Sequence, residues 1–205
     1  MKEVSFKNQI ESKQAKSRYS ALILAAGNSG RMGTDKALLV ARGSTTFSEF
    51  LVDRFLASGA EQVILVLNQR LVQSGSLPGR AEIIINRELD KGRSHSILLG
   101  LEKVPKGYAC FIQNVDNPYT DAGLIRRMLS VLQPNSYVVP VNADKGGHPV
   151  LLSPHIIEHM LTGSEWSDFR KVLSAFPKIQ LPWEDDRIHC NINTPEDYCR
   201  WLSMK

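Results

Sequence analysis

Two hydrophobic patterns alternate along the chain: short, nearly continuous apolar runs, and longer segments in which apolar residues recur with helical spacing. The run SALILAA at 20–26 predicts a buried strand, and FSEFLVDRFLAS at 47–58 predicts an amphipathic helix that ends at Gly59. Further strands are predicted at 62–67, 82–86, 109–114, 136–141, 178–182 and 187–193. Further helices are predicted at 94–104, at 122–132, in two stretches after Ser153-Pro154, and from Thr194 onward.

Strands and helices that alternate in this way are typical of βαβ units with right-handed crossovers. The pattern therefore predicts an α/β fold in which a mostly parallel sheet is sandwiched between helices. The 205 residues are enough for one sizeable domain and short for two. We expect a polar lead-in at 1–18 followed by a single domain at 19–205.

Composition and charge exclude several classes of protein. No apolar run approaches the roughly 20 residues of a membrane helix, and the lead-in lacks the apolar core of a secretory signal, so we expect a cytoplasmic protein. The net charge of +4 arises in the lead-in, which holds five Lys or Arg against two Glu and leaves 20 basic and 19 acidic residues elsewhere. A nearly neutral body without a basic stripe argues against nucleic-acid binding.

The cysteines and one histidine pair are weak candidates for chemistry. Cys110, Cys190 and Cys199 show no CxxC spacing, which favours reduced structural thiols over a disulfide framework or a zinc site. His155 and His159 stand four residues apart on a predicted helix but lack the glutamate of a HExxH motif. We interpret them as surface or edge histidines.

Ligands of an open α/β sheet bind beyond the carboxyl ends of its strands, and the first loop there is rich in glycine. Gly27, Gly30 and Gly33 allow close approach of backbone N–H groups to an anion, and Arg31 and Lys36 add positive charge. This composition predicts a phosphate-binding loop, although the spacing matches neither the dinucleotide fingerprint nor the Walker pattern. The alternative is a glycine-rich turn with two solvated cations.

Two later loops carry candidate metal ligands. Asp116 follows a predicted buried strand and could hold Mg²⁺, although an ordinary turn aspartate explains its position equally well. Asn191 and Asn193 are expected on one face of the late strand at 187–193, where an amide oxygen could bind a metal or a nucleotide. Each asparagine taken singly is compatible with simple turn chemistry before the capping residue Thr194.

Together these segments resemble a family. LAAGNSGRMGTDKALL is similar to the signature LAAGxSxRMGxxKxLL of the nucleotidyltransferases that modify the molybdenum cofactor. The resemblance extends through NRELDKGRSHSILLGL, Asp116, GGHPVLLS and NTPEDY, so it spans nearly the whole chain after residue 20. It implies a Rossmann-like three-layer sandwich that binds a nucleoside triphosphate with Mg²⁺ and transfers the nucleoside monophosphate to a phosphate-bearing acceptor, molybdopterin above all. It also implies transient contact with molybdoenzymes or cofactor-handling proteins.

The resemblance assigns roles to individual residues. Arg31 and Lys36 would neutralise charge as pyrophosphate leaves, Asp116 would hold Mg²⁺, and Asn193 would lie near a second metal position. Arg31, Lys36 and Asp116 are thus the expected catalytic residues. His148 would face the acceptor side unless it is structural. The residues expected to contact the nucleotide are Leu24, Ala25, Ala26, Gly27, Gly30, Arg31, Met32, Gly33, Lys36, Asn86 and Ser94.

Several positions depart from the family pattern or leave alternatives open. Val115 stands where the family often has glycine before the metal aspartate, and Asn193 stands where the cytidine branch has aspartate. In the family that the chain resembles, the LAAG form of the first motif goes with cytidine, and LAGG, with glycine at the position of Ala26, goes with guanosine. The last motif resembles the guanosine branch, and we expect CTP in preference to GTP. Ser94 and Ser96 either meet ribose or phosphate or cap a helix. A sugar-phosphate nucleotidyltransferase and a catalytically weakened nucleotide-binding protein are the alternative functions.

Overall fold

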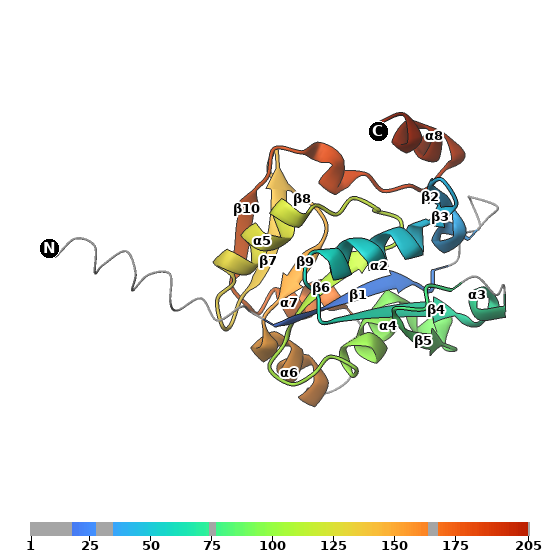
Figure 1. Ribbon diagram of the computed structural model, residues 1–205. Helices are drawn as coiled ribbons and strands as arrows, with labels where there is room; N and C mark the ends of the chain where they lie inside the picture. Colours follow the sequence, from blue (N-terminus) through green and yellow to red (C-terminus); the bar gives the residue numbers. More distant parts are fainter. Residues whose placement is uncertain (1–17, 28–34, 74–76, 164–167, 205) are drawn as a thin grey trace, which may run out of the picture.

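The computed structural model describes residues 18–27, 35–73, 77–163 and 168–204. Its main feature is an eight-stranded sheet in the order β10-β7-β9-β6-β1-β4-β5, with β8 paired to β7 (Figure 1). A separate hairpin is formed by β2 (Val40–Arg42) and β3 (Thr45–Thr46). The strands of the main sheet are β1 (Tyr19–Ala25), β4 (Gln62–Asn68), β5 (Glu82–Asn86), β6 (Ala109–Asn114), β7 (Tyr137–Asn142), β8 (Lys145–Gly146), β9 (Val150–Leu152) and β10 (Lys178–Pro182).

The sheet is mostly parallel, as predicted. β1 lies at its centre, with parallel partners β4 and β6 on its two sides, and β4 pairs in parallel with β5. β9 runs antiparallel to both β6 and β7, and β8 runs antiparallel to β7. The carboxyl ends of β1, β4, β5 and β6 therefore meet at one edge of the sheet, where an α/β fold binds its ligands.

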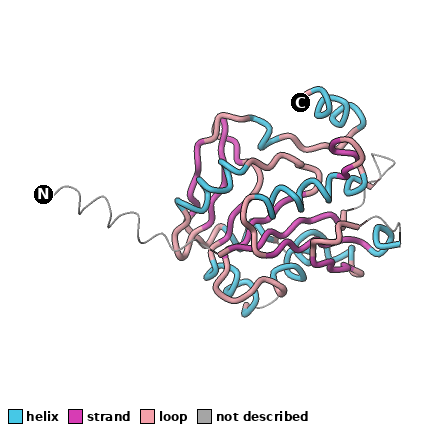
Figure 2. The backbone as a smooth tube through the Cα atoms, in the orientation of Figure 1, coloured by secondary structure: helices cyan, strands magenta, loops and turns pink. Residues whose placement is uncertain are grey.

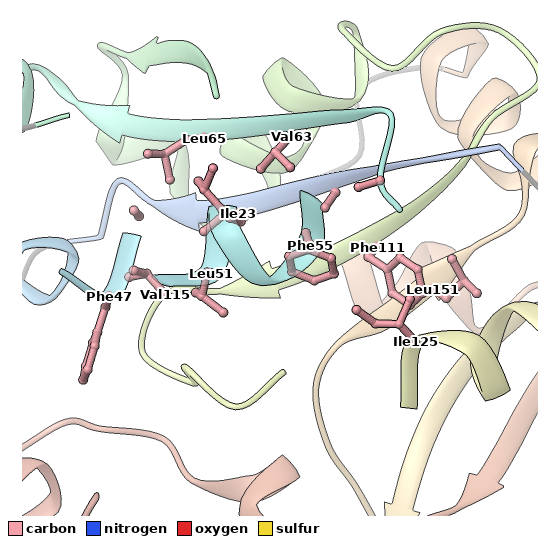
Figure 3. Close-up of a cluster of buried hydrophobic side chains, with 14 of the residues drawn as sticks. Ile23, Phe47, Leu51, Phe55, Val63, Leu65, Phe111, Val115, Ile125 and Leu151 are labelled. Carbon is pink, nitrogen blue, oxygen red and sulfur yellow. The ribbon is translucent and has the colours of Figure 1, made fainter. Parts of the chain in front are cut away.

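Helices cover both faces of the sheet and complete three layers (Figure 2). Successive residues of β1 point to opposite faces, so Ile23 joins the cluster that contains Phe55 and Phe111 (Figure 3). Leu22 joins the cluster on the other face, which contains Ile97. The first cluster lies under α2 (Phe47–Ala57) and α5 (Ala122–Val131), and the second lies under α4 (Gly92–Leu101), α6 (Pro154–Thr162) and α7 (Phe169–Leu173). The remaining helices are α3 (Gln69–Gln73) and α8 (Pro195–Ser203).

The predicted late strand at 187–193 is wrong. The chain there forms a 3-10 helix, η3 (Asp186–His189), and then an irregular segment. The Asp185 carboxylate accepts a backbone N–H inside this turn, and the carbonyl of Ile188 accepts from the Asn117 amide at 2.9 Å. Because the turn itself and the distant side chain of Asn117 satisfy these backbone groups, the segment does not join the sheet ladder.

Helix starts follow the sequence signals in part. Thr194 caps α8 in a reciprocal capping box with Asp197. Ser153 occupies the N-cap position of α6, but its hydroxyl makes no capping bond. The helix α4 begins at Gly92, so the proposed capping roles of Ser94 and Ser96 are wrong.

The weaker candidates behave as structural residues. Cys110, Cys190 and Cys199 are free thiols, of which Cys110 is fully buried. His155 and His159 are exposed on α6, and both rings lie edge-on to Phe176. Within the described ranges, no helix combines the length and the apolar character needed to cross a membrane.

Candidate active site

A cavity of about 340 Å³ opens at the carboxyl ends of β1 and β6. One side is formed by the end of β1 and the 3-10 helix η1 (Lys36–Leu38), and the other by the end of β5 and the start of α4. The lining residues are Leu24, Ala25, Ala26, Gly27, Lys36, Ala37, Asn86, Leu89, Gly92, Arg93, Ser96, Asn114, Val115 and Asp116.

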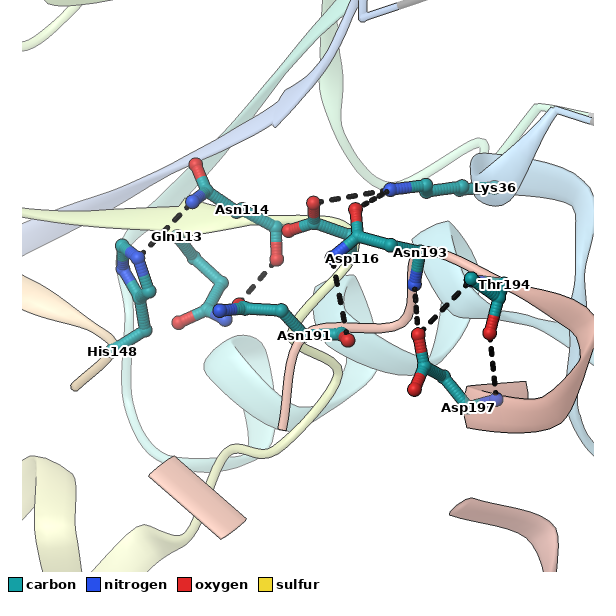
Figure 4. A network of polar contacts seen from close by, with 9 residues as sticks. All are labelled: Lys36, Gln113, Asn114, Asp116, His148, Asn191, Asn193, Thr194 and Asp197. Atoms are coloured by element: carbon teal, nitrogen blue, oxygen red, sulfur yellow. Dashed lines mark hydrogen bonds and ion pairs between the residues drawn. The ribbon is translucent and has the colours of Figure 1, made fainter. Parts of the chain in front are cut away.

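Three of the predicted functional side chains meet at this cavity (Figure 4). The Nζ of Lys36 lies 3.3 Å from Oδ2 of Asp116 and 2.7 Å from Oδ1 of Asn193. The lysine and the asparagine are 157 positions apart in the chain, so only the tertiary fold brings them together. The side chains of Lys36 and Asp116 retain 15% and 27% of their exposure, which places the ion pair in partly desolvated surroundings where charges interact more strongly than in water.

Hydrogen bonds from backbone N–H groups hold the loop after β6, which carries Asp116, against the segment before α8, which carries Asn193. The backbone N–H of Ile192 donates to the carbonyl of Asp116 at 2.7 Å, which joins the segment before α8 to the loop after β6. The carboxylate of Asp197 accepts the backbone N–H groups of Asn193 and Thr194, each at 3.0 Å. The capping box of α8 thereby fixes the backbone that carries Asn193 next to Lys36.

The loop after β6 accommodates Val115 in place of the family glycine. The Val115 backbone N–H donates to the carbonyl of Leu24 at 3.0 Å, and its side chain is buried. The loop thus continues the contact between β6 and β1 by one residue before it delivers Asp116 to the cavity. Asn191, predicted to share a strand face with Asn193, is instead exposed, and its carbonyl accepts from the Asn193 amide at 3.5 Å.

The oxygen atoms at this point suit a hard divalent cation. Oδ1 of Asp116 is buried without a hydrogen-bond partner among the described residues, although a buried carboxylate oxygen normally has one. Within the described ranges no three His, Cys, Asp or Glu side chains form a metal-binding group. A single carboxylate with an amide oxygen nearby fits Mg²⁺, which is commonly held by one or two protein oxygens together with waters and substrate phosphates.

The wall formed by β1 agrees with the predicted nucleotide contacts. Leu24, Ala25, Ala26 and Gly27 all line the cavity. A Cβ added to Gly27 would meet nothing within 4 Å, so packing among the described residues does not require glycine at this position. The predicted phosphate-loop residues Gly30, Arg31, Met32 and Gly33 lie outside the described residues.

On the opposite wall, Asn86 and Ser96 line the cavity, whereas Ser94 does not. Asn86 lines the cavity, but its Nδ2 donates to Oγ of Ser96 at 2.8 Å and its Oδ1 accepts from the Glu88 backbone at 2.8 Å. These two hydrogen bonds hold this wall of the cavity in shape. Ser96 faces the cavity, whereas the Ser94 hydroxyl is outside the lining and accepts from the backbone of Phe169 at 3.2 Å.

Arg93 and Asn114 also line the cavity, and the sequence did not single them out. Desolvation lowers the pKa of the Arg93 guanidinium, while the nearby charge of Asp116 acts in the opposite direction. Arg93 follows Gly92 in the NRELDKGRSHS segment, so its place after a glycine at a helix start was the available signal. Asn114 is the last residue of β6, a position that predicts proximity to the site but no particular role.

His148 lies behind Asn114, whose Nδ2 is 3.1 Å from Nε2 of the imidazole. Burial, followed by repulsion from Arg93, lowers the pKa of His148 to about 4, and the charge of Asp116 opposes this shift. The ring is therefore neutral at physiological pH. Its Nδ1 is buried without a hydrogen-bond partner among the described residues.

The sequence from residue 21 to residue 179 matches the model of the MobA-like NTP transferase domain. The chain belongs to this family. Comparison with curated proteins gave no match. The family assignment agrees with the cavity, because its predicted nucleotide-binding segment forms the β1 wall and supplies Lys36.

Several solved structures share the fold of this MobA-like chain. Rv0371c from Mycobacterium tuberculosis H37Rv is 24% identical with a TM-score of 0.76, and 91% of this chain aligns with 99% of that one. The same mycobacterial protein was also solved in complex with manganese, at 21% identity and a TM-score of 0.73 over 92% of this chain and 100% of that one.

Two further structures are similar over similar lengths. The 2-C-methyl-D-erythritol 4-phosphate cytidylyltransferase of Thermus thermophilus is 20% identical, with a TM-score of 0.66 over 91% of this chain and 98% of that one. The molybdopterin-guanine dinucleotide biosynthesis protein A of Archaeoglobus fulgidus is 17% identical, with a TM-score of 0.63 over 90% and 97%. At these identities the likeness establishes the fold.

The lowered pKa of His148 predicts a specific pH dependence of folding stability. Between the ordinary histidine pKa of 6.5 and the folded value of about 4, the unfolded chain binds the proton and the folded chain resists it, so stability falls as the pH falls through this window. His148→Gln removes this contribution. Urea unfolding of both proteins from neutral pH to about pH 4 should show a wild-type curve that falls more steeply than the variant curve.

His159→Gln is the matched control, because that histidine is exposed on α6. Its stability curve should run parallel to that of the wild type across the acidic range. Parallel curves for His148→Gln as well would show that His148 titrates alike in the folded and unfolded chains, contrary to the buried site described above.

Proposed function

We propose that this protein transfers a nucleoside monophosphate, CMP in preference to GMP, from a nucleoside triphosphate to a phosphate-bearing acceptor, and that molybdopterin is the favoured acceptor. The observation that carries the proposal is the contact of Lys36 with both Asp116 and Asn193, at a point where Lys36 and Asp116 line the cavity. A cation and two oxygen ligands at one point are what transfer of a phosphoryl group requires. Membership of the MobA-like NTP transferase family supports the same chemistry.

The reaction needs no covalent bond to the protein. An oxygen of the acceptor phosphate attacks the α-phosphorus of the triphosphate, a new phosphoanhydride bond forms, and the bond to the bridging β-phosphate oxygen breaks. Pyrophosphate leaves with the electron pair of the broken bond. Positioning and electrostatic stabilisation supply most of the catalysis in such transfers. Lys36, whose ammonium group lies at the cavity mouth, is suited to neutralise the charge that develops on the departing pyrophosphate.

Asp116 and Asn193 are the residues that would hold a divalent metal, expected to be Mg²⁺. The unpaired buried Oδ1 of Asp116 supports this assignment. When bound, the metal supplies positive charge to phosphate oxygens. The manganese complex of the mycobacterial structure is consistent with a divalent cation in this fold. Because Asn193 is neutral, we expect the metal to bind more tightly together with the triphosphate than alone.

The nucleotide preference rests on the β1 wall. Ala26 is 5% exposed and lines the cavity where the guanosine branch of the family has glycine, so its methyl group narrows the space for a purine. The Thermus neighbour is named a cytidylyltransferase, whereas the Archaeoglobus neighbour is named for molybdopterin-guanine dinucleotide biosynthesis. The Thermus name also supports a second candidate, in which the acceptor is a phosphorylated sugar alcohol or another phosphorylated metabolite.

Calorimetric titration with Mg²⁺ and each triphosphate should show tighter binding of CTP than of GTP. The methyl group of Ala26 is the physical reason, so Ala26→Gly should reduce the preference by admitting the larger base. Gly27→Ala serves as the companion variant, because it adds a methyl group to the same wall where a Cβ meets no protein atom within 4 Å. GTP binding equal to or tighter than CTP binding by the wild type would refute the cytidine assignment.

Lys36→Ala and Asp116→Ala should each lower the rate of pyrophosphate release by about a hundredfold or more, because each removes an electrostatic contact to the reacting phosphates. The loss in free energy of unfolding should stay within about 1–3 kcal/mol, the usual cost of a lost charged contact. Pyrophosphate release with molybdopterin and with phosphorylated sugar alcohols, measured beside thermal unfolding, tests both expectations.

Glu102 and Lys103, two consecutive exposed residues after α4, provide matched controls. Alanine at either position removes one charge outside the cavity lining. Both control variants should keep wild-type rates. If Asp116→Ala kept its rate with Mg²⁺ present, the metal assignment would be wrong. If the wild type bound CTP but released no pyrophosphate with any acceptor tested, the alternative of a catalytically weakened nucleotide-binding protein would replace the proposed transfer.

A further inference from the structure

A second cavity, of about 430 Å³, lies between α2, α8 and the loop that follows Asp116. It shares no lining residue with the nucleotide cavity. We propose that this cavity binds a small molecule that carries a phosphate or carboxylate group on a flat apolar body. Its lining residues are Ala41, Arg42, Phe50, Arg54, Pro118, Tyr119, Thr120, Asp121, Arg187, Trp201 and Met204.

The cavity carries an excess of positive charge. Arg187 pairs with Asp185, its Nε lying 2.9 Å from Oδ1, but no ion pair within the described ranges involves Arg42 or Arg54. The one carboxylate in the lining, Asp121, accepts the backbone N–H of residue 124 and so caps the start of α5. Two guanidinium groups therefore remain for an anionic ligand, and their planar forks match phosphate and carboxylate oxygens.

A buried hydroxyl in the same lining lacks a hydrogen-bond partner among the described residues. Thr120 is 6% exposed and lines the cavity, and its Oγ1 is buried without a hydrogen-bond partner among the described residues. Leaving a buried donor unpaired is costly, so such a group calls for an explanation. Rotation of the Thr120 side chain would bring the hydroxyl into the cavity, where an anionic oxygen beside the arginines would accept its hydrogen bond.

Three aromatic side chains, Phe50, Tyr119 and Trp201, also line the cavity. The guanidinium of Arg54 lies 4.9 Å from the ring centroid of Phe50, and that of Arg187 lies 4.9 Å from the ring centroid of Tyr119. The Trp201 ring packs edge-on to Phe50, with centroids 6.4 Å apart. Stacked guanidinium groups and mutually packed rings are held in place before a ligand arrives, which favours a flat apolar body next to the anionic group. The volume is also in the usual range of small-molecule sites.

Phenyl phosphate is a suitable probe, because it joins a flat ring to a phosphate. Calorimetric titration should show that the wild type binds phenyl phosphate more tightly than inorganic phosphate or phenol, and a parallel titration with benzoate compares a carboxylate on the same ring. Arg42→Ala and Arg54→Ala should each weaken the binding of phenyl phosphate about tenfold or more, the usual effect of losing a charged hydrogen bond. Arg127→Ala, an exposed arginine on α5 outside the lining, should leave it unchanged.

Thr120→Val separates a ligand-binding role from a structural one, because valine keeps the shape and removes only the hydroxyl. We expect weaker binding of phenyl phosphate with an unchanged or higher melting temperature. A lower melting temperature with unchanged binding would show that the hydroxyl serves the fold. The proposal also fails if phenyl phosphate does not bind the wild type, or if Arg42→Ala and Arg54→Ala bind it as well as Arg127→Ala does.

Lys36→Ala distinguishes this inference from the proposed transfer reaction. The second cavity predicts that this variant binds phenyl phosphate as the wild type does, since Lys36 is not in its lining. Loss of the probe in Lys36→Ala would place it in the nucleotide cavity and overturn the inference. Failure of CTP binding with retained phenyl phosphate binding would instead contradict the proposed function alone.

Discussion

The contact of the Lys36 ammonium with Asp116 and Asn193 is the constraint on which the candidate site depends. It joins three segments, η1, the loop after β6 and the turn before α8, that are far apart in the sequence. Central packing of β1 between β4 and β6 brings the first two segments to one edge of the sheet. The capping box of α8 and the hydrogen bond from Ile192 to Asp116 bring the third. The capping box and this hydrogen bond stabilise the fold, and they also position Asn193 and Asp116 beside the charge of Lys36.

The interaction is compatible with two states of the site. Without substrate, the lysine neutralises the partly buried carboxylate of Asp116, which would otherwise be costly to keep ionised away from water. Under the proposed function, the same oxygens would pair with the metal and the same ammonium with phosphate once a triphosphate and a metal are present. A positive charge would then lie beside Asp116 in both states, which would avoid a large rearrangement when substrate arrives.

Most of the fold could be predicted from local sequence, because strand and helix periods are local properties. β1 shows this clearly: its continuous apolar run follows from burial on both faces in the centre of a parallel sheet. The strand expected at 187–193 failed because its backbone is satisfied by contacts with distant residues such as Asn117, and these contacts leave no local signal. Distant contacts without a local signal also explain why Asn191 is exposed whereas Asn193 contacts Lys36.

In the candidate site too, some features have a local sequence signal and others depend on distant contacts. The family motif led to Lys36, Asp116 and the β1 wall, whereas the environment of a residue such as His148 depends on neighbours from three other elements. Ser96 lines the cavity and Ser94 does not, because α7 packs on α4 and the backbone N–H of Phe169 donates a hydrogen bond to the Ser94 hydroxyl. Such features require the tertiary structure.

The most direct measurement is a crystal structure with Mn²⁺ and CTP, in which anomalous scattering locates the metal. We expect a metal peak beside Oδ1 of Asp116, and we expect Nζ of Lys36 to have moved from the carboxylate to the triphosphate. A metal bound elsewhere, with Lys36 still paired to Asp116 and Asn193 while CTP occupies the cavity, would contradict both expectations.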